Sequence, residues 1–197
     1  MIRKNTFLKY LESIARQKLD GDVIEIGVHQ GRSLQAIGRM VAGLGIQKKI
    51  YGVDTFSGMP DIVIDGLDNG HDDHGRPTPG SGGHFPGDFS DTSIDRVERM
   101  ISGLNIILIK GIFPQCADQI PAEKFRFAHV DVDIYRSYKD TYQFLWPKMV
   151  SGGVIICGDD YDLPWLQGAK LAIDEASEEF GITPIITAKN IHILVKP

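Results

Sequence analysis

Two short apolar runs end in carboxylates and then lead into helical sequence, at residues 125–140 and 154–162. They are FRFAHVDVDIYRSYKD and VIICGDDYD, and each is typical of a buried parallel strand that feeds a crossover. Ligands of open α/β sheets bind beyond the carboxyl ends of such strands. If the two strands are neighbours, four carboxylates converge there: Asp131, Asp133, Asp159 and Asp160.

This convergence favours a site for a hard divalent cation, which keeps clustered carboxylates ionised through oxygen coordination. A single aspartate at a strand end more often caps a helix or lies in a solvated loop. The combination of DxD with DD on consecutive strands favours the cation. Asp162 is one carboxylate too many for a six-coordinate ion that also binds water and substrate, so we interpret it as a turn residue.

The rest of the chain alternates strands with helices. Strands are predicted at 22–27, 48–54, 105–110, 126–131 and 153–157, and helices at 6–19 (capped by Thr6), 32–44, 92–102, 114–119, 135–149 and 167–181. The segments TPIITA and NIHILVKP follow, and the minimal Lys189-Asn190 turn between them requires an antiparallel hairpin. The pattern predicts an α/β fold, a doubly wound, seven-stranded, mostly parallel sheet with a C-terminal antiparallel hairpin, in one domain over residues 1–197.

One long irregular segment, residues 55–90, interrupts this alternation. It is rich in glycine and far longer than an ordinary connection, which indicates a lid over a site. Its acidic and histidine residues fit either a second metal site or a solvated mobile segment, and the second is favoured: His71, Asp72, Asp73, His74 and His84. Another set either lines an acceptor pocket or pins the ends of the segment: Phe56, Met59, Phe85, Phe89 and Tyr135.

Bulk properties exclude several classes of function. A net charge of -5, a pI near 5.6 and scattered basic residues argue against nucleic-acid binding. Cys116 and Cys157 are far apart and are expected to be packed thiols in a reducing compartment. With neither a signal-like leader nor an apolar stretch of membrane-spanning length, we expect a cytoplasmic protein that does not bind membranes.

The first predicted strand leads into a glycine-bearing turn with the pattern E-x-G-x-x-x-G-x-S. Its members are Glu25, Gly27, Gly31 and Ser33. Glycines allow close approach of a ligand, and amides at a helix start bind anions, although a tight turn without ligand explains the glycines equally well. The second strand ends in Asp54, where a carboxylate can accept hydrogen bonds from ribose hydroxyls. A ribose site without a pyrophosphate loop suggests S-adenosylmethionine.

Six segments occur in a characteristic order and spacing: GDVIEIGVHQGRS, IYGVDTFSGMP, GDFSDTS, AHVDVDIYRSYKD, WPKMVSGGVIICGDDYD and GAKLAIDEA. Together they resemble the macrocin O-methyltransferase family of metal- and S-adenosylmethionine-dependent sugar O-methyltransferases, and more distantly catechol and caffeoyl-CoA O-methyltransferases. The resemblance implies magnesium ligands at Asp131, Asp159 and Asp160. It also implies that the turn from Glu25 to Ser33, with Asp54, Thr55 and Asp131, holds the cofactor, and that Gly111 to Phe113 lie near the adenine.

We therefore expect an S-adenosylmethionine- and Mg²⁺-dependent O-methyltransferase acting on a hydroxyl of a sugar-like or other diol-containing small molecule. Asp131 and Asp133 are the candidate catalytic residues, Asp133 as base or as a simple helix cap. His129 is interpreted as a hydrogen-bonded core histidine. Alternatives are a catechol or phenolic O-methyltransferase, a nucleotide-binding oxidoreductase or regulatory domain, and a non-catalytic donor-binding module. The apolar face of the N-terminal helix makes a homodimer plausible.

Overall fold

The computed structural model describes residues 2–63, 67–69, 84–158, 160–161, 166–187 and 191–197. Within these residues the chain forms one seven-stranded sheet in the order β3-β2-β1-β4-β5-β7-β6. The strands are β1 (Asp22–Ile26), β2 (Ile50–Asp54), β3 (Ile106–Lys110), β4 (Phe125–Val130), β5 (Met149–Cys157), β6 (Ile185–Ile186) and β7 (His192–Val195). Strands β1 to β5 are parallel, whereas β7 is antiparallel to β5 and β6. The predicted fold class is confirmed, and the Lys189-Asn190 turn lies outside the described residues.

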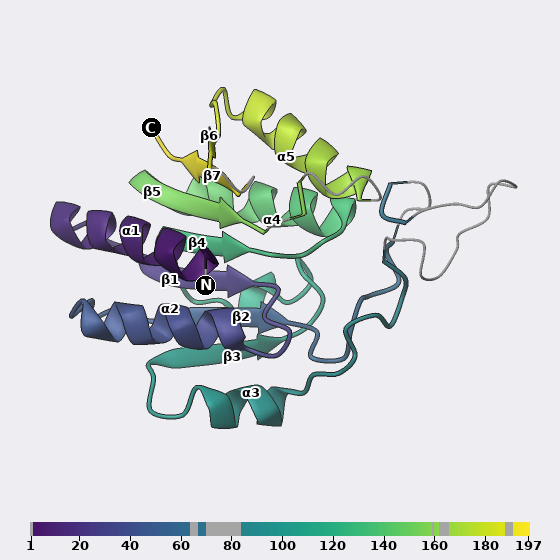
Figure 1. The fold of residues 1–197 in the computed structure, drawn as a ribbon, viewed down its shortest axis with the longest axis horizontal. Coiled ribbons are helices and arrows are strands. Elements are labelled where there is room, and N and C mark those ends of the chain that lie inside the picture. The colour runs from purple at the N-terminus through teal and green to yellow at the C-terminus, as the bar shows by residue number, and fades with distance from the viewer. Residues whose placement is uncertain (1, 64–66, 70–83, 159, 162–165, 188–190) are drawn as a thin grey trace, which may run out of the picture.

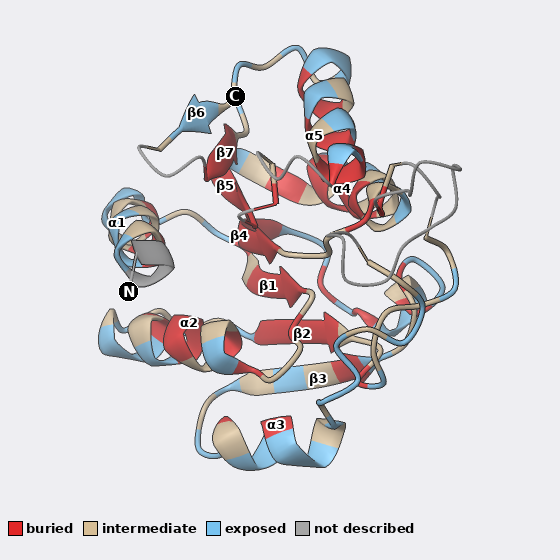
Figure 2. Ribbon diagram, turned by 45° about the vertical axis from the view of Figure 1, so that its right-hand side comes forward, coloured by how far each residue is buried: buried red, intermediate tan, exposed pale blue. Residues whose placement is uncertain are grey.

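Helices cover both faces of the sheet (Figure 1). They are α1 (Ile2–Gln17), α2 (Arg32–Gly43), α3 (Ile94–Met100), η1 (Ala117–Gln119), α4 (Tyr135–Lys148) and α5 (Gln167–Glu179). Buried side chains of α1, α2 and α3 share one core with one face of the sheet, and those of α4 and α5 share a second core with the other face. Figure 2 shows the result: burial is concentrated in the central strands, and β6 at the edge is exposed.

Strand β4 illustrates why this sheet is parallel. All six of its residues are buried, and two of them, Arg126 and His129, are polar. A strand covered on both faces needs a nearly continuous apolar run, because neither face meets water. The carboxyl ends of β1 to β5 therefore lie together at one edge of the sheet, toward which their arrows point in Figure 1.

The N-terminal helix differs from its predicted bounds. It was expected over 6–19 with Thr6 as cap, but α1 begins at Ile2, so Thr6 lies inside it. The end is earlier because Lys18 adopts φ 52°, and the amides of Lys18 and Leu19 bond back to carbonyls of the last turn, the usual closure of a helix at a left-handed residue.

The predicted apolar stripe of α1 packs on the sheet. Phe7, Leu11 and Ile14 are at most 1% exposed, so each contributes about 1.5–3 kcal/mol by burial, whereas Leu8 stays 37% exposed.

No described helix combines the length and the apolar character that a bilayer crossing needs.

Candidate active site

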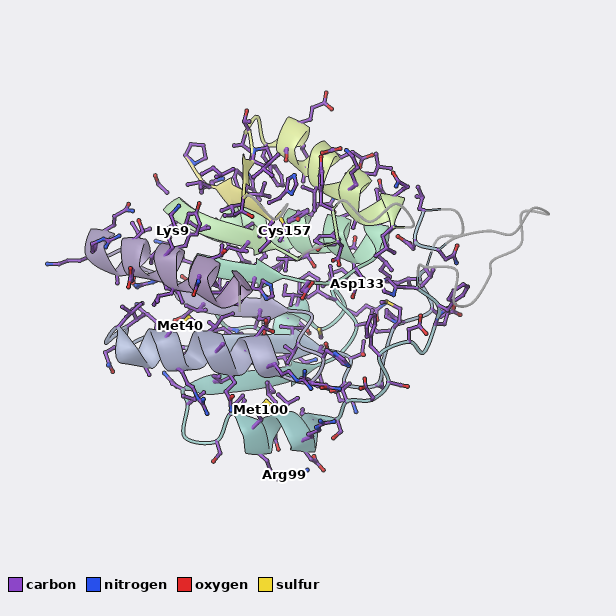
Figure 3. All side chains as sticks on the ribbon, in the orientation of Figure 1. Lys9, Met40, Arg99, Met100, Asp133 and Cys157 are labelled. Carbon is purple, nitrogen blue, oxygen red and sulfur yellow. The ribbon has the colours of Figure 1, made fainter. Side chains whose placement is uncertain are left out.

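The carboxyl ends of the parallel strands surround a cavity of about 590 Å³, a size typical of small-molecule sites. Figure 3 labels one of its residues, Asp133, beyond the ends of the strand arrows. Nine predicted site residues line it: Gly27, Ser33, Asp54, Thr55, Gly111, Phe113, Asp131, Asp133 and Asp160. Glu25 and Gly31 do not line it, and Asp159 lies outside the described residues.

The turn after β1 forms one wall of the cavity. Gly27 has φ 89°, and a Cβ added there would lie 1.9 Å from the carbonyl oxygen of Asp131. A side chain at this position would thus push apart the ends of β1 and β4, which are joined by the hydrogen bond from the Asp131 amide to the Ile26 carbonyl. Gly31, at φ 80°, is the N-cap of α2, and a Cβ added there would lie 2.9 Å from Val97 of α3.

Asp54 fastens this turn to the end of β2. Its Oδ2 accepts hydrogen bonds from the amides of Val28 and His29, both at 2.8 Å, and its Oδ1 accepts one from the amide of Phe56 at 2.6 Å. A carboxylate offers about four lone-pair positions. The predicted ribose contact would therefore use the lone-pair positions of Asp54 that these three backbone amides do not occupy.

Glu25 has a different environment from the one predicted. Because side chains alternate along a strand, Glu25 shares the face of Val23 beneath α1, and its side chain is fully buried. Its Oε1 lies 2.6 Å from Nδ1 of His129, its partner in the β1–β4 register, and the Phe7 ring packs edge-on against His129. Burial raises the pKa of Glu25, and the hydrogen bonds of His129 and Ser33 only partly oppose it.

Glu25 is therefore turned to this buried pairing in the structure, and the pairing supports the interpretation of His129 as a hydrogen-bonded core histidine. Glu25 does not line the cavity, whereas Ser33, which lowers the pKa of Glu25, does line it.

Two of the predicted carboxylates do come together. Strands β4 and β5 are neighbours, and the amide of Gly158 donates to the carbonyl of Val130 at 2.7 Å. A Cβ added at Gly158 would lie 2.1 Å from Asp131 Oδ1 and 2.9 Å from Asp160 Oδ2. The absence of a side chain at Gly158 therefore lets both carboxylates approach the same point, and we call Asp131 and Asp160 around Gly158 the carboxylate cradle.

Buried neighbours orient the cradle. Asp160 is 4% exposed, and its Oδ2 accepts a hydrogen bond of 2.9 Å from the hydroxyl of Tyr138. Burial, reinforced by Asp160, raises the pKa of Tyr138 well above its usual value, so this hydroxyl remains a donor. The described residues include no cluster of three or more His, Cys, Asp or Glu side chains arranged for a metal; Asp159 is not among them.

Asp133 is held in an unusual backbone conformation. Its φ of 59° is left-handed, which few residues other than glycine adopt without strain, and its side chain lies at the cavity wall. The Nε2 of His84 lies 3.4 Å from its Oδ1. Of the histidines predicted in the long segment, His84 therefore reaches the site; His71 and His74, with Asp72 and Asp73, lie outside the described residues.

The described parts of the long segment are pinned at the rim of the site. The amide of Met59 donates to the carbonyl of Asp88 at 2.6 Å, and the amide of Gly87 donates back to Met59 at 2.9 Å. Among the predicted pocket residues, Met59 and Phe89 line the cavity. Phe56 is buried in the core shared by α1, α2 and α3, which fits the interpretation that it pins one end of the segment, and Tyr135 packs against the opposite core.

Several residues at the site were not named individually by the sequence analysis, although His29 and Gln30 lie within the predicted turn from Glu25 to Ser33. His29 and Gln30 line the cavity, and both bond to the Asp91 carboxylate, His29 through its Nε2 at 2.6 Å. Asp91 lies within the GDFSDTS segment, so the sequence held a signal for it. Asp68 is fully buried and caps α4 by accepting a hydrogen bond of 2.8 Å from the Tyr135 amide. No local sequence pattern predicts this contact.

The chain matches a known protein family and several known proteins in sequence. The model of the macrocin-O-methyltransferase (TylF) family matches residues 2–193. The chain is 27% identical over 191 residues to mycinamicin III 3''-O-methyltransferase of Micromonospora griseorubida, covering 93% of this chain and 70% of that protein. It is 24% identical over 178 residues to demethyldecarbamoylnovobiocin O-methyltransferase of Streptomyces niveus, covering 87% and 64%.

Solved structures give the same fold. The O-methyltransferase NovP superimposes with a TM-score of 0.79 at 20% identity, over 98% of this chain and 79% of that one. The calicheamicin methyltransferase CalS11 gives a TM-score of 0.72 at 19% identity, over 96% and 78%.

Proposed function

The chain belongs to the macrocin O-methyltransferase family, and on that premise we propose an S-adenosylmethionine-dependent O-methyltransferase acting on a hydroxyl of a sugar-like or other diol-containing small molecule. The observation that carries the proposal is the carboxylate cradle, because Asp131 and Asp160 face one space at the wall of the cavity. The names of the two curated relatives support oxygen as the methylated atom. The oxidoreductase alternative has no comparable support.

The methyl donor would occupy the wall made by β1 and β2. The N-cap of α2 is Gly31, which has no side chain to cap the helix, so amides of its first turn, beside Ser33, are suited to the donor carboxylate. Asp54 and Thr55 would meet the ribose, and Gly111 to Phe113 the adenine. Bound here, S-adenosylmethionine supplies its methyl group from a sulfonium. Glu25 and Gly31 support the turn from behind.

Asp131, Asp159 and Asp160 would hold Mg²⁺ or another divalent cation. The donor set fits, since carboxylate oxygens are the ligands such ions prefer, and the missing side chain at Gly158 lets Asp131 and Asp160 approach one point. When bound, the ion lowers the pKa of a coordinated hydroxyl and orients a vicinal diol. The Tyr138 hydroxyl fixes Asp160 for this role.

Asp133 would accept the proton of the acceptor hydroxyl at one of its carboxylate oxygens. The acceptor oxygen could then attack the methyl group. Its strained backbone directs the side chain to the cavity wall. Met59 and Phe89, on the rim, would exclude water from the reacting groups.

The test is a screen for S-adenosylhomocysteine release over vicinal-diol glycosides and catechols, with Mg²⁺ or with a chelator. We expect turnover with a diol-containing acceptor that chelation abolishes, and turnover only with catechols would favour the phenolic alternative. Asp160→Asn should abolish turnover and retain S-adenosylhomocysteine binding in calorimetry. Asp20→Asn, an exposed carboxylate paired with Lys48, should behave as wild type. The proposal fails if the wild type does not bind the nucleoside, or if Asp160→Asn turns over normally.

A further inference from the structure

The side chain of Asp133 is contacted by a residue far away in sequence. Its Oδ1 lies 3.4 Å from Nε2 of His84, on residues 84–90, which we call the return limb of the long segment. The His84 side chain is 13% exposed and that of Asp133 is 24% exposed, so this pair is largely shielded from water. A contact between charges is stronger when it is shielded in this way.

His84 is itself held in position. Its backbone amide donates to the carbonyl of Asp68 at 2.7 Å, and the Asp68 carboxylate accepts the Tyr135 amide at 2.8 Å. Tyr135 is two residues after Asp133, so the contacts close a ring around the start of α4. The ring of Phe89, which lines the cavity, packs against His84 with centroids 5.1 Å apart.

The two residues have different access to the cavity. Asp133 lines it, whereas His84 does not, and the buried Nε2 of His84 faces Asp133 as an ion pair at 3.4 Å rather than as a hydrogen bond. His84 therefore contacts Asp133 from outside the cavity wall. Burial lowers the pKa of His84, but the nearby carboxylates, Asp133 foremost, outweigh burial and raise it, which favours the cationic ring facing a carboxylate.

We propose that His84 is a positioning residue that holds the Asp133 carboxylate toward the acceptor, so that docking of the return limb completes the base. The inference rests on the proposed methyl transfer, in which Asp133 accepts the proton. Asp133 alone would have to maintain a strained backbone and a defined side-chain direction at once. The contact with His84 supplies the second constraint, and its loss would misplace a reacting oxygen.

The kinetic test compares His84→Ala, His84→Gln and the control Ser90→Ala, an exposed residue of the same limb. We expect His84→Ala to lower kcat about 100-fold while KM for the methyl donor changes less than about threefold. Glutamine also carries an N–H that can face the Asp133 carboxylate, so His84→Gln should recover most of kcat. A purely structural role predicts instead that donor affinity falls together with kcat, without rescue by glutamine, and that result would overturn the proposal.

A second measurement does not depend on knowing the acceptor. Hydrogen exchange of the amides at 84–88 reports whether the limb is docked. His84→Ala and Asp133→Asn should each raise this exchange, and the double variant should raise it no further than either alone. Additive effects, or no effect of Asp133→Asn, would show that the contact does not hold the limb. Failure of the proposed function is seen separately, as absent S-adenosylhomocysteine release by the wild type and by Ser90→Ala.

Discussion

Replacing Gly158 by alanine is the most local perturbation of the carboxylate cradle. Gly158 has no positive φ, so its backbone accepts alanine and the effect is steric. The new Cβ would lie 2.1 Å from Asp131 Oδ1 and 2.9 Å from Asp160 Oδ2. Contacts between carbon and oxygen need about 3.3 Å, so the Asp131 carboxylate must move by more than about 1 Å.

The displacement predicts a large functional effect and a modest structural one. Mg²⁺ requires nearly ideal octahedral geometry, and a misplacement of about 1 Å lowers turnover about 100-fold. Crowding within a packed region should lower the free energy of unfolding by about 1–3 kcal/mol. The backbone of Asp131 remains bonded to the Ile26 carbonyl, so the donor wall keeps its shape and the affinity for S-adenosylhomocysteine should fall by no more than about threefold.

The assays are turnover against Mg²⁺ concentration, binding of Mn²⁺ followed by its EPR signal, and urea unfolding. Gly43→Ala is the matched control, because a Cβ at Gly43, the last residue of α2, meets nothing within 4 Å. It should leave turnover unchanged and stabilise the helix by at most about 1 kcal/mol. Wild-type turnover and wild-type Mn²⁺ affinity in Gly158→Ala would refute the cradle as the metal site.

Three further predictions concern groups around the cavity. His129→Leu leaves the buried carboxyl of Glu25 without its partner and should lower the free energy of unfolding in urea by about 3–5 kcal/mol. The double variant with Glu25→Leu should lose less of this free energy. A larger loss in the double variant would contradict the pairing. Asp54→Ala removes the acceptor of three backbone amides and should weaken S-adenosylhomocysteine binding more than about tenfold in calorimetry. Unchanged binding would show that the turn after β1 keeps its conformation without the Asp54 carboxylate. The pKa of His84 is raised in the folded protein, so its attraction to Asp133 stabilises fully below the unfolded pKa of 6.5 and is lost as pH rises through the raised value. The unfolding free-energy difference between wild type and His84→Gln should therefore be larger at about pH 6 than at about pH 9, and a difference independent of pH would exclude this contribution.

The fold was predictable because its information is local. Apolar runs alternate with helical periodicity, and the minimal spacing before residue 191 admits only an antiparallel return. Parallel strands bring their carboxyl ends to one edge, so the meeting of Asp131 with Asp160 follows once β4 and β5 are neighbours.

Features that depend on non-local contacts could not be predicted from the sequence. Glu25 belongs to a strand buried on both faces, so polarity alone does not indicate which face it takes, and its partner His129 is set by the β1–β4 register. Asp68 caps a helix that begins 67 residues later, a contact that only the folded chain creates. Thr6 is a favourable cap residue by type, yet the helix extends past it to Ile2.

The most direct measurement of the central claim is a crystal structure of the protein with S-adenosylhomocysteine and Mn²⁺, which scatters anomalously. The account predicts the nucleoside along the wall from Gly27 to Asp54 and Gly111, and an anomalous peak in contact with oxygens of Asp131 and Asp160. A nucleoside bound elsewhere, or these two carboxylates turned apart with no anomalous peak between them, would contradict it.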